Sequence, residues 1–136
     1  MRRKGGKKPD VYEQQKLAYW REYHEAPLIK ERFPSLTSLS IRMDFENPDW
    51  GGNPSPKQEN FGPESRAFFK VQCPHWECIE GGFNLSYAVS ELVNKRLEET
   101  KGTTTCQGWQ DRERIGQHRC LLIMNYKITA SYTKDA

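Results

Sequence analysis

Apolar and polar residues alternate most regularly between Leu39 and Phe45. Leu39, Ile41, Met43 and Phe45 are separated by polar or charged residues. Because successive side chains of an extended chain point to opposite faces, this period of two predicts a strand with one buried face. The same period, or a run of β-branched residues, predicts three more strands, at residues 67–72, 103–106 and 119–133.

Cysteines lie at the ends of these other predicted strands. Cys73 is two residues beyond Val71, and Cys106 ends a threonine-rich segment. Cys120 begins the last strand, and the residues that share its apolar face are Leu122, Met124, Tyr126 and Ile128. The strand ends are therefore expected to direct cysteines toward the interior of the protein.

A helical period of three to four residues covers two other segments. The first runs from residue 10 to about residue 33, and Pro27 is expected to break it because proline lacks a backbone donor and clashes with the preceding turn. The second begins after the potential cap Asn84, and Lys101-Gly102 is expected to end it. The apolar stripe of this second helix consists of Leu85, Ala88, Val89, Leu92, Val93 and Leu97.

Residues 47–65 are rich in proline and glycine and contain few apolar residues, so they predict a long loop. Trp50 lies in this loop and has two interpretations. It either folds back onto its own core or anchors a partner.

The order of elements predicts an α+β fold. An N-terminal helix is followed by β-β-α-β-β, which forms a mostly antiparallel sheet with a covering helix. The length of 136 residues suits one domain, at 10–136, after a basic disordered tail at 1–9. Only 35% of the residues are hydrophobic, so the core is expected to be small and to need an additional source of stability.

The positive net charge of +3 is concentrated in the tail. Residues 1–9 hold five of the 21 basic residues and no acidic residue, which leaves 16 basic against 18 acidic residues in the rest of the chain. The folded part is therefore slightly acidic, and its net charge does not favour binding to nucleic acid or to an anionic membrane.

Uninterrupted apolar runs are short, the longest lying near 120–124, whereas a membrane span needs about 20 residues. We expect no membrane association and a cytoplasmic location. Because a reducing compartment disfavours stable disulfides, the four cysteines are more readily interpreted as metal ligands.

The spacing of the cysteines predicts a metal site. Four residues separate Cys73 from Cys78, 27 separate Cys78 from Cys106, and 13 separate Cys106 from Cys120. A turn after one strand and a hairpin can thus converge on one ion, and Zn²⁺ in structural sites prefers four such ligands. The pattern Cys73-Pro-His-Trp-Glu-Cys78, with the other two cysteines, resembles a zinc-ribbon-like four-cysteine domain.

The resemblance covers about residues 67–125 and implies a structural zinc ion. Zinc ribbons generally have two residues between paired cysteines, so the fold around the metal is expected to differ here. The segment is also similar to small uncharacterised bacterial proteins, which implies no function. His75 and His118 lie beside the cysteines, and either could replace one as a ligand. Alternatively, some of the cysteines are only small buried hydrophobic residues.

The function that these residues favour is a non-catalytic zinc-binding module with a surface for a protein or an RNA. Arginine next to aromatic side chains can stack on bases and pair with phosphates. The expected surface consists of Trp76, Trp109, Arg112, Arg114, His118 and Arg119. The plainer interpretation of this hairpin tip is a solvated surface with cross-strand ion pairs.

Two alternatives remain from the sequence. The same thiolates could form a redox sensor that releases its metal on oxidation. A zinc enzyme would need only three protein ligands and an open position. Because the chain lacks the motifs of zinc deaminases and metalloproteases, we expect neither catalysis nor a small-molecule substrate.

Overall fold

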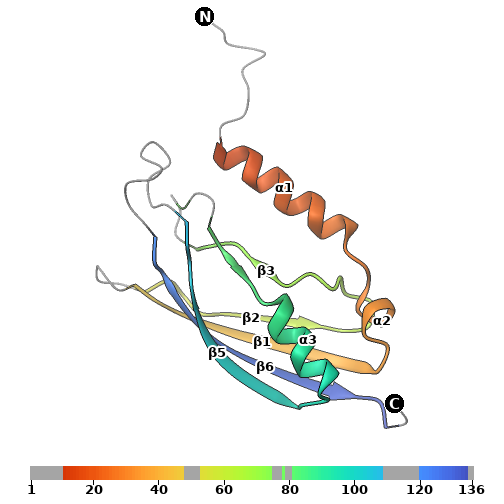
Figure 1. The fold of residues 1–136 in the computed structure, drawn as a ribbon. Coiled ribbons are helices and arrows are strands. Elements are labelled where there is room, and N and C mark those ends of the chain that lie inside the picture. The colour runs from red at the N-terminus through yellow and green to blue at the C-terminus, as the bar shows by residue number, and fades with distance from the viewer. Residues whose placement is uncertain (1–10, 48–52, 75–77, 79–80, 109–119, 135–136) are drawn as a thin grey trace, which may run out of the picture.

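The computed structural model describes residues 11–47, 53–74, 78, 81–108 and 120–134. These residues form the α+β fold that the sequence predicted (Figure 1). In chain order the elements are α1 (Val11–Glu25), α2 (Ile29–Arg32), β1 (Leu36–Glu46), β2 (Lys57–Phe61), β3 (Lys70–Val71), β4 (Phe83–Asn84), α3 (Ser86–Asn94), β5 (Glu99–Thr105) and β6 (Ile123–Tyr132). None of the helices in these ranges is both long enough and apolar enough to cross a membrane.

The main sheet has four antiparallel strands in the order β2-β1-β6-β5. The predicted alternation in β1 is confirmed, since Leu39, Ile41, Met43 and Phe45 are at most 3% exposed. Arg42, between two of them, is exposed. One face of the sheet is therefore apolar and the other is polar.

A second layer covers the apolar face (Figure 1). It contains α3 and the two-stranded ribbon β3-β4. Val89 and Leu92 of α3 are fully buried in the same core as Ile128 of β6, and the rings of Phe45 and Phe83 lie 6.0 Å apart. Burial of these side chains is the main force that holds the two layers together.

Helix α1 lies outside this core (Figure 1). Its Tyr19 donates a hydrogen bond to the carbonyl oxygen of Lys70 at 3.1 Å, and the Tyr19 and Tyr23 rings contact Phe68 edge-on. Trp20 remains 48% exposed. The helix is thus attached through aromatic contacts and not through fully buried residues.

The predicted break at Pro27 is confirmed, because α1 ends at Glu25 and α2 begins at Ile29. The backbone N–H of Ala67 donates to the Pro27 carbonyl at 2.7 Å. The Ile29 N–H donates to the Ser65 carbonyl at 2.8 Å, and Ile29 is buried. At this break, hydrogen bonds therefore hold the segment before β1 against the segment that leads to β3.

The prediction of a loop throughout 47–65 is wrong for residues 57–61, which form β2. Its sequence, Lys-Gln-Glu-Asn-Phe, shows no apolar alternation, and only Phe61 is partly buried. The strand forms because its backbone pairs with β1, from Leu39 opposite Phe61 to Met43 opposite Lys57. An edge strand needs no two-sided burial, so its polar sequence gave no signal.

The prediction that Lys101-Gly102 ends the second helix is also wrong. Helix α3 ends at Asn94, and Gly102 lies inside β5 opposite Tyr126. Any side chain at position 102 would collide with the Tyr126 ring. The ring therefore occupies the space that the glycine leaves free.

Arg96, with φ of 50°, ends α3 in the left-handed conformation. The N–H of Leu97 donates to the Leu92 carbonyl at 2.9 Å and that of Arg96 to the Val93 carbonyl at 3.0 Å, which is the Schellman arrangement. The Arg96 guanidinium lies 4.8 Å from the centre of the Tyr132 ring. Contacts with β6 thus hold an arginine where glycine is the usual residue.

Candidate metal centre

The four cysteines meet at one end of the sheet. Cys73 follows β3, Cys106 follows β5, and Cys120 precedes β6. Thr105 is paired with Ile123, so the segment that follows β5 lies next to the segment that precedes β6. The sulfur atoms of Cys73, Cys78, Cys106 and Cys120 all lie within 4.8 Å of one another.

Two sulfur pairs lie within hydrogen-bonding contact. The Cys73–Cys120 sulfur distance is 3.7 Å and the Cys78–Cys106 distance is 3.5 Å, so each pair joins the β3–β4 segment to the β5–β6 segment. All four cysteines are free thiols, because a disulfide bond measures about 2.05 Å. Ligands of a tetrahedral zinc ion with bonds of about 2.3 Å are separated by about 3.8 Å. The four sulfurs therefore fit one metal ion.

Backbone hydrogen bonds position Cys106 and Cys120. The Cys106 N–H donates to the Leu122 carbonyl and the Cys120 N–H to the Gly108 carbonyl, both at 2.8 Å. Leu121, directly after Cys120, has a positive φ of 53°, and its N–H donates to the Cys106 carbonyl at 3.2 Å. This bulge continues the β5–β6 pairing far enough to fix both cysteines, although they lie outside the strands.

Two glycine N–H groups point at the Cys106 sulfur. Gly82 donates at 3.2 Å and Gly108 at 3.5 Å. N–H donors of this kind stabilise the negative charge of a thiolate and orient it toward a metal. These two glycines could not be identified from the sequence, because a backbone donor has no signature in the side-chain pattern.

Gly81 packs against the sulfurs of the cluster. A Cβ atom at this position would collide with the sulfurs of both Cys78 and Cys106. It would also lie 3.0 Å from the Gly108 Cα. Only glycine therefore lets the β3–β4 segment approach the sulfurs so closely.

Burial and hydrogen bonding give the thiols different pKa values. Hydrogen bonds from Cys120, Cys73 and Cys78 hold the pKa of the Cys106 thiol far below its usual value of 9.0. The hydrogen bond with Cys106 raises the pKa of both Cys73 and Cys78. Because four adjacent thiolates repel one another, ionising all of them requires a positive charge in their midst. A bound cation supplies that charge.

The site is closed on the sides that the structure describes. Cys78, Cys106 and Cys120 are at most 2% exposed, and Cys73 is partly exposed. Among the described residues, no other set of three or more possible metal ligands lies so close together.

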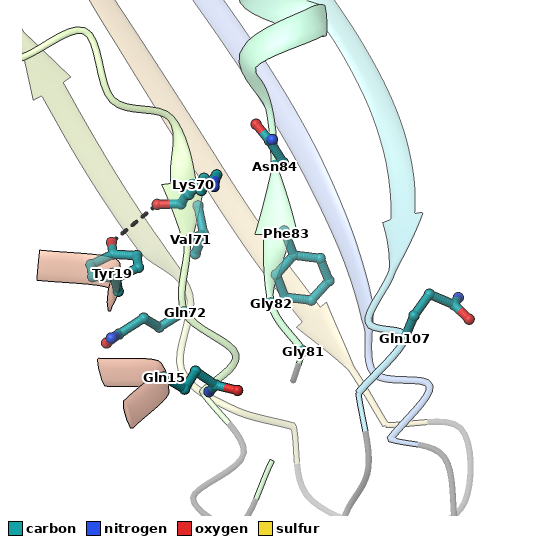
Figure 2. Close-up of a pocket in the computed structure, with 10 residues that line it drawn as sticks. All are labelled: Gln15, Tyr19, Lys70, Val71, Gln72, Gly81, Gly82, Phe83, Asn84 and Gln107. Carbon is teal, nitrogen blue, oxygen red and sulfur yellow. Dashed lines mark hydrogen bonds between the residues drawn. The ribbon is translucent and has the colours of Figure 1, made fainter. Parts of the chain in front are cut away.

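A cavity of about 310 Å³ adjoins the cluster, between α1 and the β3-β4 ribbon (Figure 2). Its walls include Tyr19, Gln72, Gly81 and Gln107. Gly81 and Gly82 separate it from the sulfurs, since none of the residues that line it is a cysteine.

The predicted interaction surface lies outside the described residues. This holds for Trp76, Trp109, Arg112, Arg114, His118 and Arg119, and also for His75 and Trp50. These predictions therefore remain predictions from the sequence.

No protein-family model matches the chain, and no curated protein or solved structure is similar to it.

Proposed function

We propose that Cys73, Cys78, Cys106 and Cys120 bind one structural Zn²⁺ as thiolates, and that the protein is a non-catalytic zinc-binding module. The observation that carries this proposal is the convergence of four sulfurs within 4.8 Å, three of them almost fully buried. An all-thiolate donor set favours soft or borderline metals over Mg²⁺ and Ca²⁺, and zinc is the usual ion of closed four-cysteine sites.

The surroundings of the sulfurs support a structural role. A catalytic zinc keeps one coordination position for water or substrate, whereas four thiolates fill a tetrahedral shell. Among the described residues that line the neighbouring cavity there is no cysteine. The ion would instead connect the segment after β3 to the segment between β5 and β6.

A site of four thiolates needs cysteines that stay reduced, because neighbouring thiols in an oxidising compartment are readily joined into disulfides. We therefore include the cytoplasm in the proposal.

Native mass spectrometry of the protein purified without chelator tests the metal. We expect a mass increment of one zinc ion per chain, and loss of this increment in each of the four single Cys→Ser variants. A matched control is Ser90→Cys, which leaves the four ligands intact and should retain one zinc. A wild-type protein that is folded and free of metal would contradict the proposal.

We include the resemblance to a zinc ribbon and the binding of a partner in the same proposal. We propose that the metal-held segments support a surface for a protein or an RNA, which the sequence places around Trp109 and Arg112. A gel-shift assay with generic RNA over a salt series separates the two, because phosphate contacts weaken as salt increases. Salt-sensitive binding supports RNA, and absence of binding leaves a protein as the partner.

A further inference from the structure

We propose that the four-cysteine site is also a peroxide-sensitive switch, in which Cys73 is oxidised first and Cys120 then forms a disulfide bond with it. This inference rests on the proposed zinc site, whose regulation it describes. It goes beyond metal binding because it assigns different roles to the four sulfurs.

Exposure distinguishes Cys73 from the other three cysteines. Cys78, Cys106 and Cys120 are at most 2% exposed, whereas Cys73 is partly exposed. Oxidation of thiolates follows their accessibility to the oxidant. Cys73 is therefore the one cysteine of the four that keeps partial solvent exposure as a residue, and we place the first oxidation there.

Hydrogen bonds and close packing protect Cys106 from oxidation. Its sulfur accepts hydrogen bonds from the N–H groups of Gly82 and Gly108, and the Gly81 backbone covers it together with Cys78. Hydrogen bonds to a thiolate stabilise its electron pair and reduce its nucleophilicity. Burial and hydrogen bonding thus both direct the reaction away from Cys106.

Cys120 is placed to resolve the oxidised Cys73. The two sulfurs lie 3.7 Å apart, so they need to approach by less than 2 Å to reach the disulfide bond length of about 2.05 Å. Cys78 and Cys106 lie 3.5 Å apart and form the corresponding second pair. The geometry therefore pairs Cys73 with Cys120, and leaves Cys78 with Cys106.

The chemistry consumes one peroxide for each disulfide. The Cys73 thiolate attacks hydrogen peroxide, the O–O bond breaks, hydroxide leaves, and Cys73 becomes a sulfenic acid. The Cys120 thiolate attacks this sulfur, the S–O bond breaks, and a second hydroxide leaves. Two protons from solvent convert the hydroxides to two waters. The two sulfurs supply two electrons, and Zn²⁺ loses two of its four ligands.

The test uses the full-length, zinc-loaded protein. Its zinc content is measured first, and the protein is then treated with one equivalent of hydrogen peroxide. A chromogenic chelator reports released zinc, and peptide mass spectrometry without reduction maps the disulfide. A parallel sample containing dimedone traps sulfenic acids.

We expect zinc release, a Cys73–Cys120 disulfide, and a dimedone adduct at Cys73 about tenfold more abundant than at the buried cysteines. Reduction with dithiothreitol should restore zinc binding. A first adduct or disulfide on Cys78 or Cys106, or retention of zinc by unoxidised protein, would overturn the switch. Folded protein without zinc before peroxide is added would instead contradict the zinc site itself, so the two failures are distinguishable.

Discussion

The two ends of the main sheet are held together by different means. The helix-cap end, formed by Leu92, Arg96, Leu97 and Tyr132, consists of apolar packing and hydrogen bonds, and the Tyr132 hydroxyl points at the Leu97 carbonyl at 2.7 Å. The cysteine end, formed by Cys73, Cys78, Cys106 and Cys120, joins segments outside the strands through four sulfurs. The strands thus carry the fold along the sheet, whereas beyond their ends four cysteines that could hold a metal ion bring the segments together.

The largest expected effect comes from removing a metal ligand at the cysteine end. Cys106→Ser should abolish zinc binding and lower the free energy of unfolding by about 3 kcal/mol or more, because a structural zinc supplies on the order of 10 kcal/mol of binding free energy. Zinc content and thermal denaturation measure this effect. Wild-type protein treated with a strong chelator should behave like the variant, and a variant with one zinc and wild-type stability would contradict the account.

A truncation away from the cysteines should affect stability without affecting the metal. Ile128 is fully buried in β6, and Ile128→Ala should lower the free energy of unfolding by about 2–5 kcal/mol through the cavity that it creates. Ile128→Val serves as a graded control with a loss of about 0.5–1.5 kcal/mol. Denaturant unfolding with parallel zinc analysis should give one zinc in both variants. Loss of zinc from folded Ile128→Val would show that the two ends are not independent.

Gly81 allows a test of the cysteine end that leaves every ligand in place. Gly81→Ala puts a methyl group against the Cys78 and Cys106 sulfurs, and it should weaken stability by about 1–3 kcal/mol as overpacking does. Gly62→Ala is the matched control, because a Cβ atom there meets no other atom within 4 Å. Competition with a chelator should show lower zinc affinity for Gly81→Ala only. Equal affinities in the two variants would refute the close packing at Gly81.

The smallest expected effect lies at the helix-cap end. Tyr132→Phe removes the hydroxyl that points at the Leu97 and Leu92 carbonyls, and it should cost about 0.5–1.5 kcal/mol with zinc content unchanged. Tyr87, which is 78% exposed, provides the control Tyr87→Phe, for which we expect no change. Chemical denaturation distinguishes them, and identical unfolding curves would argue against the cap.

The same tyrosine gives a pH dependence. Burial raises the pKa of Tyr132 above its usual value of 10.0, so the folded state retains the phenol proton at a pH where the unfolded chain loses it. Its contribution to stability is therefore complete below pH 10 and is lost as the pH rises through the folded pKa. Tyr132→Phe should flatten this alkaline decline relative to wild type in denaturation curves recorded above pH 9.

The sequence predicted the elements in which burial follows a period. The structure confirms the alternation in β1, the break at Pro27, and the burial of Val89, Leu92 and Val93 on α3. Leu97, which was predicted to belong to the same apolar stripe, lies beyond α3 and is 44% exposed. The four cysteines could be identified as a group from the sequence, because cysteine is seldom found on a protein surface and recurs here near the ends of strands.

The parts that the sequence did not predict depend on contacts distant along the chain. Strand β2 is polar and exists through backbone pairing with β1. Helix α3 ends at Asn94 and is followed by the left-handed Arg96, which Tyr132 and Thr133 hold. Gly102 lies in a strand beside Tyr126. At the metal centre, the N–H donors of Gly82 and Gly108 are positioned by the fold alone. None of these features has a local pattern.

X-ray absorption spectroscopy at the zinc edge tests the central claim most directly, because it reports the atoms bound to the metal. The protein should be purified without chelator and measured as one full-length chain. Four thiolates predict a first shell of four sulfur atoms at about 2.3 Å. A first shell that contains nitrogen or oxygen, or a folded protein with no zinc to measure, would contradict the four-cysteine site.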